Sequence, residues 1–128
     1  MFGLLAVGLG AFGAHGLKES ISEELFSAYH TGVEYQFLHA VVLLILALIC
    51  SDSRGTEVFR FAAYAMVAGI LLFSGSLYVL ALTDLRYLGP LPIGVITPVG
   101  GSVLIMAWLL MLVGSLKKPN KDPSEGTD

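Results

Sequence analysis

Charged residues are scarce in this chain, and their scarcity excludes most classes of water-soluble protein. Asp, Glu, Lys and Arg make up 13% of the 128 residues, whereas 55% are hydrophobic and the mean hydropathy is +0.80. An ordinary globular domain is about 25% charged, so the polar coat that keeps a domain in solution is missing. The formal net charge of −3 is spread over gaps and tail. It provides no basic patch for a nucleic-acid partner.

Cysteines and catalytic motifs are also scarce. The single cysteine, Cys50, excludes an intrachain disulfide, and we interpret it as a small buried apolar residue more readily than as a reactive thiol. No Cys or carboxylate joins the histidines at zinc-ligand spacing. A haem held between His15 and His39 would need both rings in one cavity. We therefore expect no enzyme activity, no cofactor and no metal site.

What the chain has instead is four long apolar stretches, at about residues 1–16, 35–50, 61–82 and 98–116. A helix rises about 1.5 Å per residue, so each stretch covers about 24 to 33 Å, close to the roughly 30 Å of a bilayer core. These stretches predict an all-α fold, a four-helix transmembrane bundle with short loops. Residues 1–116 would form this domain, and the polar residues 117–128 a disordered tail.

The first stretch could be a cleaved signal peptide or a retained span. A signal peptide carries basic residues before its apolar core, and residues 1–16 contain no Lys or Arg. We therefore predict a retained, slightly short span. A natural start upstream of Met1 would explain its shortness.

Local signals predict where two of the helices begin. Ser20 and Glu23 have the spacing of a capping box, and no break follows, so we expect one long helix over about residues 22–50. Thr97 and Pro98 fit the cap and the first position of the fourth helix. The alternative is that Pro98 kinks a longer helix from within.

The distribution of Lys and Arg predicts the orientation in the membrane. Five lie on the side of the chain ends and two on the other side: Arg54, Arg60, Lys117, Lys118 and Lys121 against Lys18 and Arg86. The positive-inside rule then places both termini in the cytoplasm. The membrane would be the plasma (inner) membrane in a bacterium.

Small residues at helical spacing predict how the spans pack. Close approach through small residues contributes much of helix association in lipid. The expected packing residues are Ala6, Gly10 and Ala14 in the first span and Ala65 and Gly69 in the third. We expect these two spans to pack on each other rather than to form a homodimer seam. Trp108, near the middle of span four, is expected to fill a gap between helices.

Polar side chains in the spans collect at one depth. Because successive spans run in opposite directions, these residues should share a layer near the non-cytoplasmic surface: His15, Gln36, His39, Ser74, Ser76, Tyr78 and Thr97. Polar groups inside a bilayer act as hydrogen-bond links between helices or mark a functional pathway. His39 is either a buried hydrogen-bonding residue or part of a ligand or proton site. His15 caps a helix end or lies at the interface.

Four ordered motifs resemble a known family. They are residues 10–17 (GAFGAHGL), 35–40 (YQFLHA), 73–78 (FSGSLY) and 96–101 (ITPVGG). Together they resemble the family called domain of unknown function 423, which includes the animal transmembrane protein 256. The resemblance covers about residues 1–116 and implies a four-helix, multi-pass membrane protein, without an established reaction or substrate. The chain departs from the family in its shorter first span and in Phe26, where many members carry Trp.

Two functional hypotheses follow from these observations. The first is a non-enzymatic component of the lipid bilayer that binds a protein or lipid partner, with a membrane protein or a second copy as the protein. The alternative is a small transporter or channel subunit that uses the polar layer.

Overall fold

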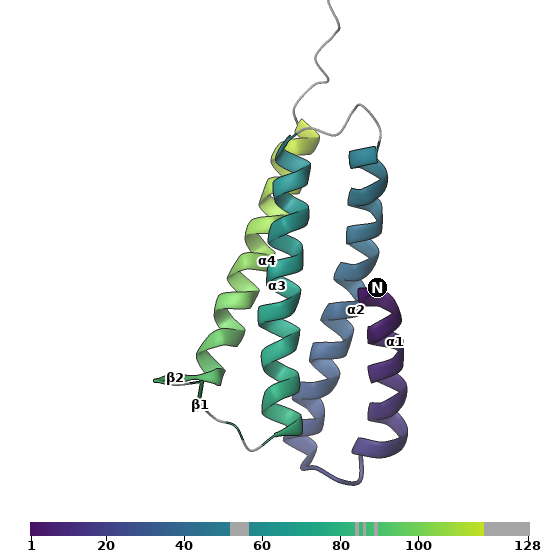
Figure 1. Cartoon of the computed structure of the whole chain (residues 1–128), viewed down its shortest axis with the longest axis vertical. Coiled ribbons are helices and arrows are strands. Elements are labelled where there is room, and N and C mark those ends of the chain that lie inside the picture. Colours follow the sequence, from purple (N-terminus) through teal and green to yellow (C-terminus); the bar gives the residue numbers. More distant parts are fainter. Residues whose placement is uncertain (52–56, 84, 86, 89, 117–128) are drawn as a thin grey trace, which may run out of the picture.

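The computed structural model describes residues 1–51, 57–83, 85, 87–88 and 90–116 (Figure 1). Its elements follow in the order α1 (Phe2–Phe12), the π-helix η1 (Gly13–Leu17), α2 (Glu23–Ser51), α3 (Glu57–Leu82), β1 (Tyr87–Leu88), β2 (Leu91–Pro92) and α4 (Ile93–Leu116). The predicted tail, and with it Lys117, Lys118 and Lys121, lies outside the described residues, as do Arg54 and Arg86. The predicted all-α class with four helices is confirmed. Two-residue strands β1 and β2 add a small antiparallel pair before α4.

Three of the helices are long and apolar enough to cross a membrane. They are α2, α3 and α4, with 29, 26 and 24 residues. The fourth predicted span is the exception, because the apolar helix over Phe2–Leu17 is shorter and covers only about 24 Å. In Figure 1 it lies beside the first half of α2, with Met1 level with the middle of that helix.

The predicted long second helix is confirmed, but its cap differs from the prediction. Ser22 Oγ accepts the backbone N–H of Leu25 at 3.3 Å, as an N-cap side chain does. Ser20, predicted to form the capping box, instead donates its hydroxyl to the Gly16 carbonyl at 3.0 Å. Ser20 therefore closes the preceding helical turn, and Ser22 starts α2.

The predicted start of the fourth helix at Thr97 is wrong. The helix begins at Ile93, and Pro98 lies inside it. Ile93 is 2% exposed, so its burial extends the helix one turn before Pro98. Thr97 consequently sits in the helix and is available to a neighbouring helix, while Pro98 has no N–H to give to the Gly94 carbonyl.

Helix α3 packs against both α2 and α4. At its contact with α4, a Cβ added to Gly100 would overlap the backbone of Phe73, so these two backbones approach as closely as glycine allows. The apolar core between the three long helices consists of Val42, Leu46, Ala62, Met66, Ile70, Leu104 and Ala107.

The predicted packing of the first span on the third is also wrong. A Cβ on Gly10 would meet Val33 of α2 at 3.4 Å, whereas Gly69 of α3 faces Leu104 of α4. Of the other predicted packing residues, Ala6 is buried, Ala65 lies half-buried against the apolar core, and Ala14 is exposed. Small residues were therefore a sound indicator of helix contacts, but their spacing did not identify the partner helix.

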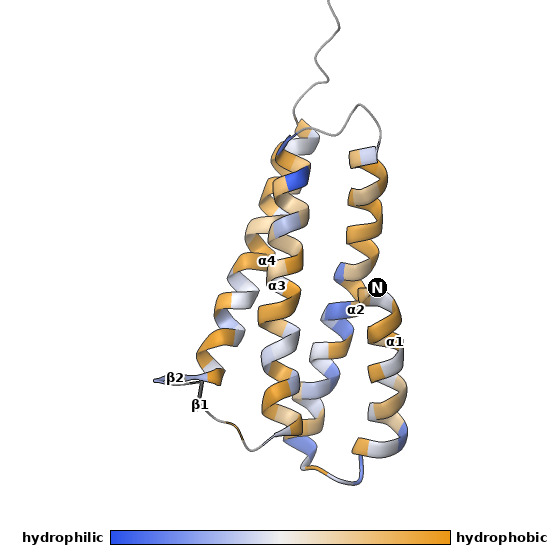
Figure 2. Ribbon diagram, viewed as in Figure 1, coloured by the Kyte–Doolittle hydropathy of each residue, from blue (hydrophilic) through white to orange (hydrophobic). Residues whose placement is uncertain are grey.

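Hydropathy differs between the two ends of the bundle. Figure 2 shows hydrophilic and hydrophobic residues mixed along the first half of α2, and an almost wholly hydrophobic second half. The second half of α2 runs beside the start of α3 and the end of α4 (Figure 1). Among the polar residues predicted to share a layer, Gln36 and His39 lie at the middle of α2. Those of α3 and α4 lie nearer the end where α2 begins: Ser74, Ser76, Tyr78 and Thr97.

Candidate functional site

Of the seven polar residues predicted to share a layer, six are buried or half-buried between the helices. Gln36, His39, Ser74 and Ser76 are buried, with 1% to 6% of their surface exposed. Tyr78 and Thr97 are half-buried. We call these six residues the polar layer. His15, the seventh, lies in η1 and is exposed.

Gln36 joins three helices through its amide group. Its Nε2 donates to the Phe2 carbonyl of α1 at 2.9 Å, and its Oε1 accepts the hydroxyl of Tyr78 on α3 at 3.0 Å. Both ends of the amide are therefore used, and the hydrogen bonds set its orientation.

Tyr29 extends this connection and was not among the residues predicted to share the layer. Its hydroxyl donates to the Leu9 carbonyl at 2.7 Å, and its ring lies 5.3 Å from that of Tyr78 between centroids. It is 1% exposed. Tyr29 precedes Gln36 by two helical turns, so helical spacing alone would have placed both residues on one face.

His39 connects α2 to α4. Its Nε2 accepts the indole N–H of Trp108 at 3.3 Å, and its Nδ1 lies 2.6 Å from the Tyr35 carbonyl. Because indole nitrogen only donates, Nε2 must be the unprotonated nitrogen and Nδ1 must carry the hydrogen. Both ring nitrogens of His39 are therefore engaged in hydrogen bonds within the bundle.

Trp108 does not fill a gap between helices as predicted. It is 46% exposed, and only its indole N–H turns inward to the edge of His39, at a centroid distance of 6.2 Å. The ring thus faces the surroundings of the bundle while its polar atom is satisfied inside.

A pair of hydroxyl groups connects α3 to α4. Ser76 Oγ donates to the Phe73 carbonyl at 2.8 Å and lies 2.8 Å from Thr97 Oγ1. Since the single Ser76 proton points to the carbonyl, Thr97 is the donor in the second bond. Starting α4 at Ile93 is what places Thr97 on a helix facing Ser76.

Ser74 is the exception in the polar layer. It is 1% exposed, and within the described part of the chain its Oγ is the buried side-chain polar atom that has no hydrogen-bond partner. An unsatisfied buried hydroxyl costs about 1–3 kcal/mol, so Ser74 adds nothing to the links between helices.

The remaining titratable residues near this end stand apart. His30 and Glu34 form an exposed pair at 3.4 Å on the outer face of α2, as their spacing predicts. Across the described ranges, no three His, Cys, Asp or Glu side chains come together as a metal site would require. In the described part of the chain, what the geometry brings together is a set of hydrogen-bonding side chains.

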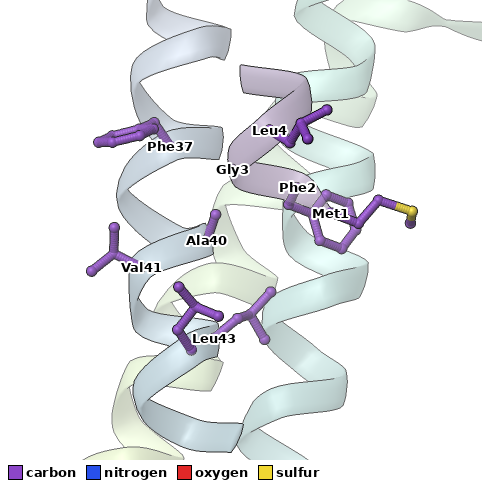
Figure 3. A pocket seen from close by; sticks show the side chains of 9 residues that line it. Met1, Phe2, Gly3, Leu4, Phe37, Ala40, Val41 and Leu43 are labelled. Atoms are coloured by element: carbon purple, nitrogen blue, oxygen red, sulfur yellow. The ribbon is translucent and has the colours of Figure 1, made fainter. Parts of the chain in front are cut away.

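An apolar cavity of about 400 Å³ lies beside α2 at the level where α1 begins (Figure 3). Its lining is Met1, Phe2, Gly3, Leu4, Phe37, Ala40, Val41, Leu43 and Leu44.

The fold and the polar layer identify the class of this protein. It is a small helical membrane protein whose buried polar side chains connect its helices. Residues 9–101 match the model of the family described as "Protein of unknown function (DUF423)", and the chain belongs to this family. The resemblance seen in the four motifs is thereby confirmed.

Relatives in several bacteria cover most of the chain. It is similar to the UPF0382 membrane protein YwdK of Bacillus subtilis, with 44% identity over 89% of each chain. It is also similar to a UPF0382 membrane protein of Staphylococcus epidermidis, with 42% identity over 89% of this chain and 88% of the relative. The UPF0382 inner membrane protein YgdD of Escherichia coli shares 38% identity over 95% of this chain and 88% of its own. No solved structure matches the chain significantly.

Proposed function

We propose that this chain is a non-enzymatic membrane component that binds a lipid or a protein partner. One observation carries the proposal: the buried side chains of Gln36, His39 and Ser76 are occupied by hydrogen bonds to groups of the bundle itself. A catalytic or transport site needs polar groups that are free to meet a substrate. The polar layer acts instead as an internal support, which leaves the outer surface for recognition.

The alternative of a transporter or channel subunit receives less support. Within the described residues, the polar layer offers only the Ser74 hydroxyl as an unused buried group. A single short hydroxyl does not line a pathway. Vesicles containing the purified protein should therefore show no more flux of protons, ions or small solutes than empty vesicles. Flux above that level would favour the alternative.

We propose that the start of α3 and the end of α4 face the cytoplasm of a bacterial inner membrane. Arg60 lies at this end and Lys18 at the opposite one, and the excess of basic residues counted in the sequence is on the Arg60 side. The relative in Escherichia coli is named an inner membrane protein, which supports the choice of membrane.

Cysteine labelling tests the orientation. In a Cys50→Ala background, a Lys18→Cys variant should react with an impermeant maleimide added to whole cells. A Ser115→Cys variant should react only after the membrane is opened. The reverse pattern would contradict the orientation.

Purification from mild detergent tests the main proposal. We expect at least one lipid or protein, a second copy of the chain included, to be retained at a stoichiometric amount and identified by mass spectrometry. Exchange into a delipidating detergent is the control and should release a bound lipid. A monomer without any stoichiometric partner would contradict the proposal.

A further inference from the structure

A second cavity lies between η1 and α2, at the end of the bundle opposite Arg60. Its volume is about 310 Å³. The lining consists of Gly10, Gly13, Ala14, Lys18, Phe26, Tyr29, His30 and Val33. None of these residues belongs to the first two turns of α1.

The π-turn of η1 shapes this cavity. The backbone N–H of Lys18 bonds to the Gly13 carbonyl, five residues earlier, at 3.2 Å. This wider turn brings Lys18 over the same side of the helix as Gly13 and Ala14, and such turns often occur at functional sites.

Tyr29 fixes the opposite wall. A Cβ on Gly13 would lie 2.7 Å from the Tyr29 ring, so only glycine lets this ring pack so closely. The hydroxyl of Tyr29, which donates to the Leu9 carbonyl, holds the ring in place. The two walls are thus joined by a hydrogen bond and by van der Waals contact.

The lining combines an apolar surface with a cation at its edge. Phe26 and Val33 provide apolar side chains, and Lys18 provides an exposed ammonium group. Across the described part of the chain, no carboxylate forms an ion pair with Lys18, whereas His30 is paired with Glu34. Glu19, Glu23 and Glu24 are exposed in the same region, but none of them lines the cavity.

We propose that this cavity binds an acidic phospholipid of the non-cytoplasmic leaflet. Lys18 would contact the lipid phosphate, because a lysine at the membrane surface can bury its stem along apolar groups and keep its ammonium at headgroup level. The first part of an acyl chain would lie against Gly10 and Val33. Basic pockets between membrane helices on the cytoplasmic side bind lipid headgroups, and Lys18 would play the corresponding part at the opposite surface. The inference rests on the proposed function and names its lipid partner.

Native mass spectrometry of the delipidated protein tests this site. The protein would be mixed with equal amounts of phosphatidylglycerol and phosphatidylcholine that carry the same acyl chains. We expect phosphatidylglycerol to be bound in preference. Lys18→Gln should reduce that preference about five-fold, the factor that corresponds to about 1 kcal/mol per basic residue at a membrane surface.

Two matched controls separate the site from general charge. Arg60→Gln removes the same charge at the other end of the bundle and should leave the preference unchanged. Ala14→Leu should fill the cavity and reduce binding of both lipids, since Ala14 is exposed and lines it. Ala11→Leu adds the same bulk at an exposed residue outside the lining and should have no effect.

Several results would overturn the lipid site. Equal effects of Lys18→Gln and Arg60→Gln on the lipid preference would show a general charge effect. Unchanged lipid binding by the Ala14→Leu variant would show that no acyl chain occupies the cavity. Displacement of phosphatidylglycerol by millimolar inorganic phosphate would make free phosphate the ligand. If the untreated protein retains a stoichiometric protein partner but shows no preference between the two lipids, the lipid site fails while the proposed function stands.

Discussion

The two ends of the bundle hold their helices together in different ways. At the end where α2 begins, hydrogen bonds of Gln36, His39 and Ser76 connect α2 to α1 and α4, and α3 to its neighbours. At the other end the core is Val42, Leu46, Ala62, Met66, Ile70, Leu104 and Ala107, where only apolar surfaces meet. The first end combines directional bonds with close packing, as between Gly100 and Phe73, whereas the core at the other end relies on apolar packing.

This difference teaches what each mode contributes in lipid. Hydrogen bonds between membrane helices average only about 0.6 kcal/mol, because the separated helices also find polar partners. Close glycine contacts, by contrast, cannot be replaced without moving a backbone. Close packing should therefore contribute most of the free energy of unfolding, and hydrogen bonds should determine which helix faces which.

The largest expected effect comes from Gly100→Ala. Its new Cβ would overlap the backbone of Phe73, so α3 and α4 would have to separate, at a cost of about 3 kcal/mol. Gly94→Ala is the matched control on the same helix, because nothing lies within 4 Å of that position. Unfolding by a denaturing detergent in mixed micelles measures both. Equal stability of the two variants would contradict the close contact.

Next in size is Gln36→Leu, which leaves the Tyr78 hydroxyl and the Phe2 carbonyl without their partner. We expect a loss of about 1–3 kcal/mol in the same unfolding assay. A double-mutant cycle with Tyr78→Phe should give a coupling of about 0.6 and at most about 1.7 kcal/mol. Additive effects would mean that the two side chains do not interact.

A smaller effect is expected where α2 meets α4. Trp108→Phe removes the donor to His39 and should cost about 0.6 kcal/mol. Nitrogen-15 NMR of labelled histidines should show His39 protonated at Nδ1 in the unmodified protein. The exposed His15 and His30 serve as references. Protonation at Nε2 instead would rule out the bond from Trp108.

Two serines of α3 give the smallest effects and the sharpest comparison. Ser76→Ala removes the bond with Thr97 and should cost about 0.6 kcal/mol. Ser74→Ala removes a hydroxyl that has no partner and should change the unfolding free energy by less than about 0.5 kcal/mol, or raise it. A larger loss for Ser74→Ala than for Ser76→Ala would show that Ser74 has a partner in the membrane.

The burial of Gln36, His39 and Ser76 agrees with the prediction that polar side chains in the spans face other helices, but their pairings could not be predicted from the sequence. Spacing does not say which helix lies opposite, so Gly69 was matched with the first span although it faces Leu104 of α4.

Local rules failed where burial overrode them. Pro98 satisfied the rule for a helix start, yet the helix begins at Ile93 because that side chain is buried. Tyr29 precedes the second apolar stretch, so it was not counted among the polar residues of the spans. The π-turn of η1 leaves no recognisable sequence signal, so the cavity beside it could be found only in three dimensions.

The bond between Trp108 and His39 has a consequence for biosynthesis. These residues are 69 positions apart, so a ribosome adding about 5–20 residues per second reaches Trp108 roughly 3 to 14 s after His39. During that interval the His39 imidazole of the nascent protein lacks its indole donor. The last helix to be translated therefore completes the arrangement of the second, and truncated chains would leave it unfinished.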